Sequence, residues 1–278
     1  MSARFIFSRR AIFIVWVFMI TSCTKENLPP VPPVAPYQPS AVRPESPDHG
    51  HGSLTIAIPE NKPPYFNGAT DDGIERDIIQ ESFQLAGRHP EFMETAGRQK
   101  KYDSSRLGIE CVSTISEELK LKSESYFSDP VVTYHYTPFT LKKSGILIKD
   151  YKDLAGRTVE AFSLASSYLG EEFSSTIPKM LSYSEHQNRS SQVALLLHGR
   201  VEILVIDRAM FHFIRSSLVS VRPEDYDAEV LEVPVEKNVD FKVVCHDKAI
   251  LDDFNRGLSM LHASHRYEEI FGHYLSEK

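Results

Sequence analysis

The pattern of apolar and polar residues over positions 53–278 predicts strands and helices in alternation. Strands are predicted where apolar residues alternate with polar ones or run continuously, at 53–59, 107–114, 131–143, 157–162, 201–207 and 240–247. Helices are predicted where apolar residues recur every three or four positions, at 73–86, at 190–199 and from Asp247 onward. This alternation argues for an α/β domain.

The predicted helices carry recognisable ends. The first places Ile74, Ile78, Ile79, Phe83 and Ala86 on one face, and Gly87 suits its stop. The helix at 190–199 has serine at its start and Gly199 at its end. The last long helix has Asp247 as N-cap, and its apolar face holds Ile250, Leu251, Phe254, Leu258 and Leu261.

The first 22 residues predict an export signal. Three Arg precede an apolar run of ten residues, from Ala11 to Ile20. Because a helix needs about 20 apolar residues to span a bilayer, this run is too short for a permanent transmembrane helix. The ending Ile20-Thr21-Ser22-Cys23 resembles the bacterial lipobox, which implies that Cys23 is acylated after cleavage. A plain secretory signal with an incidental cysteine is the alternative.

The segment 23–52 predicts a lipid anchor followed by a disordered tether, because residues 24–52 are rich in proline and lack apolar periodicity. Thr24 follows the cysteine where Asp would resemble an inner-membrane retention signal. We therefore expect a periplasmic protein anchored to the outer membrane if the cell has two membranes. Removing residues 1–22 lowers the net charge from −7 by three, to −10. This acidic balance does not favour nucleic acid as a partner.

Cys111 and Cys245 remain as a pair once Cys23 is assigned to the anchor. Both lie in apolar, strand-like stretches. A disulfide is consistent with an oxidising compartment, and two buried thiols are equally consistent with the sequence.

The order of motifs resembles the extracytoplasmic solute-binding proteins of family 3, the amino-acid receptors of ABC transporters. The resemblance covers nearly all of 53–278. It rests on PPYFNG followed by GIERDIIQESFQLAG, on FSDP at 127–130, on YKDLAGRTVEAF, on LLLHGRVEILVIDRAMF, and on DDFNRGLSMLHASHRYEEIFGHYL.

The resemblance implies a two-lobed periplasmic-binding-protein type II fold with two crossing strands as the hinge. Lobe 1 is expected at 53–139 plus 236–278, and lobe 2 at 140–235. Ligand binding is expected to close the lobes by a hinge motion. We expect a monomer without a cofactor or a metal.

The resemblance also implies ligand-binding residues at the carboxyl ends of strands. Asp207 matches the carboxylate that holds a ligand's α-amino group, although it is equally suited to cap the following helix. Tyr65 or Phe66 matches the aromatic residue that packs against the ligand, although either could belong to the core.

The carboxylate end of the site departs from the family pattern. The family motif S-I-T-x-x-R is matched by residues 114–119, where Thr114 and Ser116 keep hydroxyls but Leu119 replaces the arginine. Ser166 and Ser167 replace a Gly-Thr or Gly-Ser pair. These changes predict a poor fit for an ordinary zwitterionic amino acid.

We therefore expect a membrane-anchored solute-binding lipoprotein that captures a small polar solute, amino-acid-like or an amine, for an ABC-type importer. The alternatives are a sensor or a degenerate scaffold that acts on a protein partner. A dehydratase-like enzyme on the same fold is less favoured, because the chain has no phosphate loop, no His-Glu-x-x-His and no nucleophile elbow.

Overall fold

The computed structural model describes residues 54–95, 108–119, 125–219 and 228–275. All of them belong to one compact unit, Gly50–Lys278. The predicted signal at 1–22, Cys23 and the tether lie outside the described residues. Within the described part of the chain, no helix is both long enough and apolar enough to cross a membrane.

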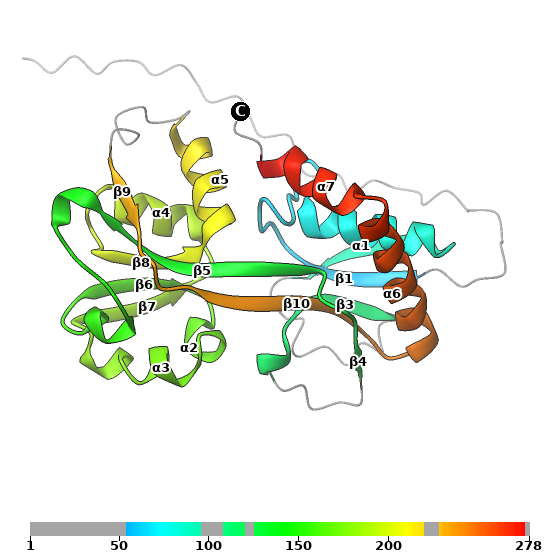
Figure 1. The fold of residues 1–278 in the computed structure, drawn as a ribbon, viewed down its shortest axis with the longest axis horizontal. Helices are drawn as coiled ribbons and strands as arrows, with labels where there is room; N and C mark the ends of the chain where they lie inside the picture. Colours follow the sequence, from blue (N-terminus) through cyan, green and yellow to red (C-terminus); the bar gives the residue numbers. More distant parts are fainter. Residues whose placement is uncertain (1–53, 96–107, 120–124, 220–227, 276–278) are drawn as a thin grey trace, which may run out of the picture. The chain divides into compact units, whose positions relative to one another are not determined.

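The described residues form a mixed α/β structure, which confirms the predicted class (Figure 1). The strands are β1 (Leu54–Pro59), β2 (Pro90–Thr95), β3 (Cys111–Ile115), β4 (Tyr126–Phe127), β5 (Val132–Leu141), β6 (Thr158–Phe162), β7 (Ser182–His186), β8 (Ile203–Asp207), β9 (Val230–Glu232) and β10 (Lys237–Cys245). The α-helices are α1 (Ile74–Leu85), α2 (Ala165–Tyr168), α3 (Gly170–Ser174), α4 (Arg189–Leu197), α5 (Arg208–Val219), α6 (Lys248–Ala263) and α7 (Arg266–Leu275). Short 3-10 turns are η2 (Glu117–Leu119), η3 (Lys142–Ser144), η4 (Tyr151–Leu154) and η5 (Ile177–Lys179).

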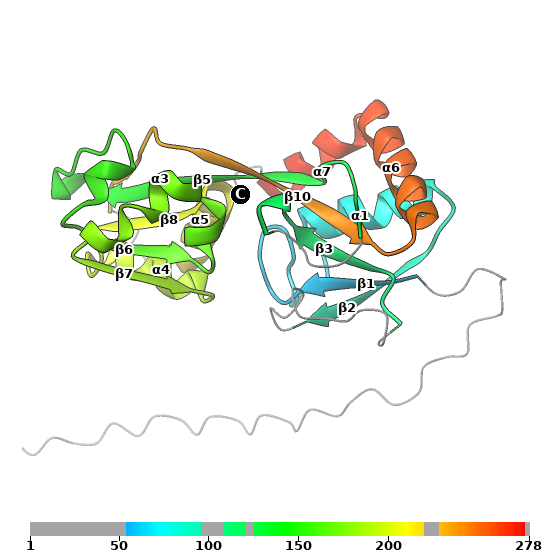
Figure 2. The ribbon, with the colours of Figure 1, turned by 90° about the horizontal axis from the view of Figure 1, so that it is seen from below.

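Two long antiparallel strands, β5 and β10, join two groups of elements. The strands pair in the order β2-β1-β3-β10-β5-β8-β6-β7, with β4 on β10 and β9 on β5. The first half of β10 pairs with the first half of β5, from Lys237↔Tyr136 to Phe241↔Val132. Beyond this shared stretch β10 continues onto β3, and β5 continues onto β8. Figures 1 and 2 show α1, α6 and α7 beside β1 and β3, and α2 to α5 around β6 to β8.

The predicted elements are largely confirmed, with one wrong cap and four missed strands. Asp247 caps α6 by accepting a hydrogen bond from Ala249 N at 2.7 Å. The cap of α4 is Asn188 rather than serine, because the helix begins one residue earlier and the Asn side chain accepts from Ser191 N at 3.0 Å. Strands β2, β4, β7 and β9 were not predicted. Strands β4 and β9 have only two and three residues, and β2 and β7 stand at the two ends of the strand order with few buried residues, so these sequences lack a strong apolar pattern.

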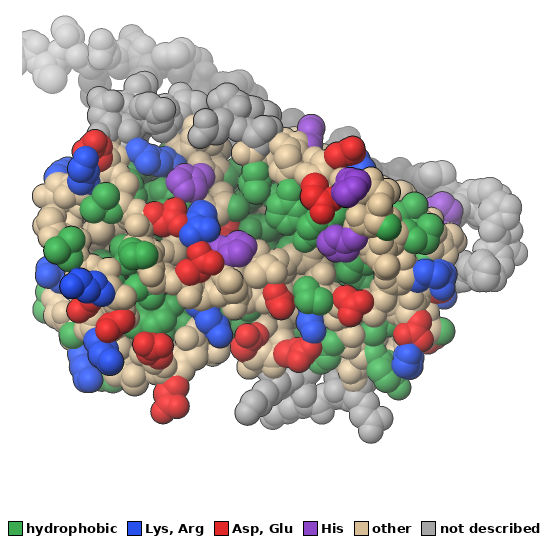
Figure 3. Space-filling model, viewed as in Figure 1, with side chains coloured by type: hydrophobic (Ala, Val, Ile, Leu, Met, Phe, Trp, Pro, Cys, Tyr) green, Lys and Arg blue, Asp and Glu red, His purple; other side chains and the backbone are tan. Residues whose placement is uncertain are grey.

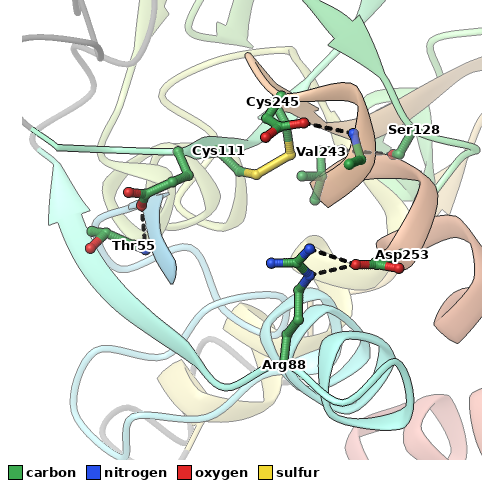
Figure 4. The surroundings of a disulfide bond; sticks show 10 residues. Thr55, Arg88, Cys111, Ser128, Val243, Cys245 and Asp253 are labelled. Carbon is green, nitrogen blue, oxygen red and sulfur yellow. Dashed lines mark hydrogen bonds and ion pairs between the residues drawn. A yellow bond between two sulfur atoms is a disulfide. The ribbon is translucent and has the colours of Figure 1, made fainter. Parts of the chain in front are cut away.

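Cys111 and Cys245 form a disulfide, which decides between the two alternatives left open by the sequence. The two residues are fully buried and lie opposite each other on β3 and β10 (Figure 4). The bridge joins residues 134 positions apart in the chain. It therefore joins the last residue of β10 to the first residue of β3.

The FSDP motif attaches to the same strand. Ser128 N donates to Val243 O at 2.9 Å, and Ser128 Oγ accepts from Val243 N at 3.0 Å. Asp129 N donates to Asn255 Oδ1 on α6 at 3.0 Å. These bonds fix the start of β5 against β10 and α6.

Helices α1 and α6 pack closely through a glycine. A Cβ added to Gly257 would lie 1.8 Å from the backbone oxygen of Ser82, whereas one added to Gly272 would meet nothing within 4 Å. The rings of Phe83 and Phe254 meet nearby, with centroids 4.9 Å apart.

Gly257→Ala is expected to destabilise the fold, because the new methyl group pushes α6 off α1. The expected loss is roughly 1–3 kcal/mol of the free energy of unfolding, measured by urea denaturation. Gly272→Ala on α7 is the matched control and should gain up to about 1 kcal/mol from helix propensity. Equal effects of the two substitutions would contradict the packing described here.

The double variant Cys111→Ser/Cys245→Ser is expected to lose about 5 kcal/mol at most, because the closed loop is long and the unbridged chain gains entropy when unfolded. Denaturant unfolding measures the loss. A reducing agent should destabilise the wild type by a similar amount and leave the double variant unchanged. A wild type that is as stable as the double variant would argue against a formed bridge.

Candidate ligand-binding site

Three charged side chains are buried among the described residues: Lys62 is 8% exposed, and Glu75 and Asp207 are 0% exposed. Other acidic and basic side chains stand at the surface with mixed signs, as the face in Figure 3 shows. Burying a charge is costly unless it is compensated. This cluster at the strand crossing is therefore the candidate functional site.

Aromatic side chains pack around the cluster from β5, β10 and the segments beside them. Tyr134 and Tyr136 are two residues apart on β5 and point to the same face. Tyr65 stacks on Tyr134 with ring centroids 4.0 Å apart, and Phe162 stacks on Tyr136 at 3.8 Å. Phe241 of β10 lies 4.4 Å from Tyr134. All five are buried, so the rings exclude water from the charges.

Asp207 ends β8 and is held by three donors. Its Oδ1 accepts from Met210 N at 2.9 Å and from Tyr65 OH at 3.1 Å, and its Oδ2 accepts from His135 N at 2.9 Å. The bond from Met210 N makes Asp207 the N-cap of α5, which confirms the capping role that the sequence suggested. Burial raises the pKa of Asp207, against the opposing effect of these hydrogen bonds. Its role toward a ligand stays a prediction.

Of the two aromatic candidates, the structure brings Tyr65 to the cluster. Its hydroxyl reaches Asp207, and its backbone oxygen accepts from Glu75 N at 3.2 Å. Phe66 is 2% exposed and belongs to the hydrophobic core, and its amide donates to Lys62 O in the turn at 62–66.

Glu75 was not predicted as a site residue. Its Oε1 accepts from Thr114 Oγ1 at 2.7 Å, and its Oε2 accepts from Tyr134 OH at 3.0 Å. Burial raises the pKa of Glu75, while the Lys62 ammonium works against this rise. The sequence did hold a signal for this position. Glu75 lies three residues before Ile78 and four before Ile79, so it shares the apolar face of α1.

Thr114 joins the site from the end of β3, but Ser116 is directed elsewhere. Thr114 has a φ of 58°, which is unusual for a β-branched residue, and its hydroxyl donates to Glu75. Such strain is often found at functional sites. The hydroxyl of Ser116 donates to Glu118, an exposed residue of the turn η2 that Leu119 ends.

Lys62 is the second residue that the sequence analysis missed. Its ammonium lies over two ring faces, 4.2 Å from the centroid of Tyr134 and 4.7 Å from that of Phe241. The pKa of Lys62 is lowered to about 7, mainly by burial and also by the positive charge of Arg189, while Glu75 and Asp207 oppose the fall. The signal was weak, because a lysine beside two prolines is typical of an exposed turn.

The serine pair at the start of α2 lies next to an internal carboxylate. Glu185 accepts from Leu164 N at 2.6 Å and from Ser166 N at 2.9 Å, and from Tyr183 OH at 2.6 Å. Burial disfavours its charge, yet the bonds from Tyr183 and Ser166 hold the pKa of Glu185 below its usual range. Ser167 is exposed. The ligand roles of Ser166 and Ser167 stay predictions.

The arrangement suits recognition of a charged organic group. It offers two buried carboxylates, a buried ammonium, tyrosine hydroxyls and flat apolar rings, the usual components of a small-molecule site. Of the side chains described, no group of three or more His, Cys, Asp or Glu is placed to hold a metal ion.

Lys62 should make stability depend on pH. Below pH 7 the folded and unfolded chains both hold its proton, so the cost of burying the ammonium is present in full. Above pH 7 the folded chain gives up the proton while the unfolded chain, with a pKa near 10.5, keeps it. The free energy of unfolding should therefore rise with pH relative to that of Lys62→Met, by up to about 1.4 kcal/mol per pH unit.

Urea denaturation of both proteins between pH 6 and pH 9 measures this difference. Lys248→Met, which removes an exposed lysine of α6, is the control and should follow the wild type. Parallel pH profiles for the wild type and Lys62→Met would contradict a buried lysine.

Comparison with known proteins identifies solved structures that share this fold. No protein-family model and no curated protein sequence matches the chain. Among solved structures, the P235GK mutant of the arginine-binding protein ArgBP from T. maritima has a TM-score of 0.62 and 19% identity, over 81% of this chain and 96% of that one.

Two further structures are similar. A histidine kinase sensor domain with similarity to periplasmic binding proteins has a TM-score of 0.63 and 17% identity, over 81% of this chain and 97% of that one. The GluR0 ligand-binding core in complex with L-glutamate has a TM-score of 0.64 and 13% identity, over 82% and 100%. The fold implied by the sequence resemblance is thus confirmed: this chain has the two-lobed α/β fold of the periplasmic binding proteins, with β5 and β10 as the crossing strands.

Proposed function

We propose that this chain is an extracytoplasmic solute-binding lipoprotein of the family 3 type, which captures a small polar solute between its lobes. The solute is amino-acid-like or an amine. The observation that carries the proposal is the buried cluster of Lys62, Glu75 and Asp207 beneath aromatic rings at the strand crossing. We expect binding rather than catalysis.

The charges of the cluster favour a ligand with a cationic group. Two carboxylates face one ammonium, and burial raises the pKa of both acids. A fold that needed only stability would gain little from these groups, because buried ion clusters seldom outperform apolar packing. A bound cation would balance the second carboxylate and lower the pKa of both acids toward their usual values.

The comparisons support the same class of ligand. The similar solved structures include an ancestral arginine-binding protein bound to arginine and an ABC transporter substrate-binding protein with bound histidine. Both ligands carry an α-amino group. At 20–21% identity these structures share the fold with this chain, and the ligand class is our proposal.

Closure of the lobes would be held by contacts between them. We assign 53–139 with 236–278 to lobe 1 and 140–235 to lobe 2. On this division, the hydrogen bond from Tyr65 OH to Asp207 Oδ1 joins the two lobes. Hinge closure around a ligand would then be stabilised at Asp207, the residue that also caps α5.

The proposed function also includes a lipid anchor at the N-terminal side and a membrane partner. Cys23 would carry the acyl chains, and residues 24–52 would act as the tether to the membrane. Delivery of the solute to an ABC-type importer fits the periplasmic-binding fold. A sensor is the second candidate, favoured by the similarity to a histidine kinase sensor domain. Neighbouring genes for a permease and an ATPase would favour transport, and a histidine kinase or cyclase gene would favour sensing.

Asp207→Asn is expected to weaken binding of an amine-bearing solute about 10- to 100-fold, because it replaces a charged acceptor by a neutral one and Asn still caps a helix well. A thermal-shift panel of amino acids, amines, opines and small organic acids on the full-length protein in detergent identifies the solute, and calorimetry then measures both affinities.

Asp252→Asn, on the exposed surface of α6, is the matched control and should bind like the wild type. A solute that binds the wild type and Asp207→Asn equally well would remove Asp207 from the site. A panel without any hit would count against solute binding and favour a protein partner.

A further inference from the structure

Four polar side chains meet on the outer side of the strand crossing and are called the outer ion cluster here: His135, Arg208, Glu232 and Glu236. His135 alternates along β5 with Tyr134 and Tyr136, so its side chain points away from the aromatic rings of the candidate site. Arg208 Nη2 donates to Glu236 Oε2 at 2.6 Å, and Arg208 Nε donates to Glu232. The Nδ1 atom of His135 lies 3.0 Å from Glu236 Oε1.

Arg208 joins the start of α5 to the segment 232–236, which carries the chain from β9 to β10. Its two partners, Glu232 and Glu236, are the two ends of this segment. On the proposed division of the lobes, Arg208 and Glu232 belong to lobe 2 and Glu236 to lobe 1. The guanidinium therefore holds one acid of each lobe.

The outer ion cluster is connected to Asp207 in two ways. Arg208 follows Asp207 directly in the chain, as the first residue of α5. The backbone amide of His135 donates to Asp207 Oδ2 at 2.9 Å, while the imidazole of the same residue contacts Glu236 on the opposite face of β5. The strands β8, β5 and β10 meet at this point, since Tyr136 pairs with one residue of each neighbour. A closed ring of contacts thus begins and ends at the Asp207 carboxylate.

Water and salt can reach the outer ion cluster, unlike the site behind it. The side chains of Arg208 and His135 are each 43% exposed, and those of Glu232 and Glu236 are each 32% exposed. A surface hollow of about 370 Å³ is lined by Arg208, Glu232, Val233, Pro234 and Glu236. The pKa of Glu236 is lowered, mainly by the hydrogen bond from His135. Salt weakens exposed ion pairs, whereas buried charges are screened much less.

We infer that the outer ion cluster positions Asp207 for the ligand, although the cluster lies on the far side of β5. Arg208 is a positioning residue, because it ties α5 to the segment beside β5, and α5 and β5 supply the two backbone donors that hold the Asp207 carboxylate. The inference rests on the proposed solute-binding function and adds regulation to it. Binding should depend on ionic strength through side chains that the solute does not touch.

Hydrogen exchange of the full-length protein in detergent reports the position of Asp207 without any ligand. The His135 amide should exchange about three- to tenfold faster in Arg208→Gln than in the wild type, because its acceptor is no longer fixed. Mass spectrometry with fragmentation to single residues measures this rate. Arg157→Gln is the matched control, since Arg157 is 41% exposed and pairs with Glu202 elsewhere in lobe 2. Exchange at His135 should be the same in this control as in the wild type.

Salt and a second variant distinguish positioning from a general loss of stability. Raising NaCl from about 50 mM to about 500 mM should speed exchange at His135 in the wild type and have little effect in Arg208→Gln, which has already lost the ion pairs. Glu236→Gln should act like Arg208→Gln. The double variant should show less than the product of the two single effects, because both substitutions remove the same contact.

Calorimetric titration with L-arginine and with cadaverine connects the outer ion cluster to binding. Arg208→Gln should bind whichever probe the wild type binds about three- to tenfold more weakly. Arg157→Gln should bind that probe like the wild type. Melting curves of the two variants check that a difference in affinity does not follow from a difference in stability.

The outcomes separate the positioning role from the proposed function. Equal exchange at His135 in the wild type and Arg208→Gln, or equal affinity of the two for a probe that the wild type binds, overturns the positioning role and leaves solute binding in place. Faster exchange in Arg208→Gln, with neither probe bound by the wild type, supports the positioning of Asp207 and counts against the proposed function alone.

Discussion

The antiparallel pairing of β5 with β10, between Val132–Tyr136 and Lys237–Phe241, is the constraint on which the rest of the structure depends. Each strand is longer than this shared stretch, so one continues onto β3 and the other onto β8. The pairing fixes which faces of the two strands point to the same side, and so it sets Tyr134, Tyr136 and Phe241 together. The disulfide between β3 and β10 and the Ser128 bonds to β10 hold one end of this arrangement in register. The three buried charges each contact β5: Lys62 lies over the ring of Tyr134, Glu75 accepts from the hydroxyl of Tyr134, and Asp207 accepts from the amide of His135.

The three charges buried at this crossing are stabilised in two different ways. Glu75 and Asp207 are desolvated, but each of their oxygens accepts at least one hydrogen bond, which offsets much of the cost. Lys62 is held differently, by ring faces and by the distant attraction of the two acids. The two carboxylates are therefore held in place by neutral donors, whereas the Lys62 ammonium lies against the faces of two aromatic rings.

Glu185 accepts hydrogen bonds at the start of α2, where the sequence resemblance predicted contacts with a ligand. The amides of Leu164 and Ser166 are oriented by the left-handed Leu164, whose φ is 72°, and by the short helix α2. A carboxylate from β7 meets them, and the hydroxyl of Tyr183 completes its hydrogen bonds. Three donors hold this carboxylate in place beside α2.

The amino-acid sequence by itself determined the α/β class, most strands and helices and their order, because burial on one face leaves a periodic pattern that is local in the chain. The strand ending at Asp207, the long strand from Val132 and the helix capped by Asp247 are examples. Edge strands such as β2 and β7 escaped prediction, because half-exposed strands carry little apolar signal. Tyr65, Thr114 and Asp207 could be named from motif order, and the structure does bring them to one cluster. Only the tertiary structure decided that Lys62 and Glu75 are buried there and that Cys111 bonds to Cys245. The reason is physical: burial and pairing of a charge depend on residues far away in the chain, which converge only when β5 and β10 pair.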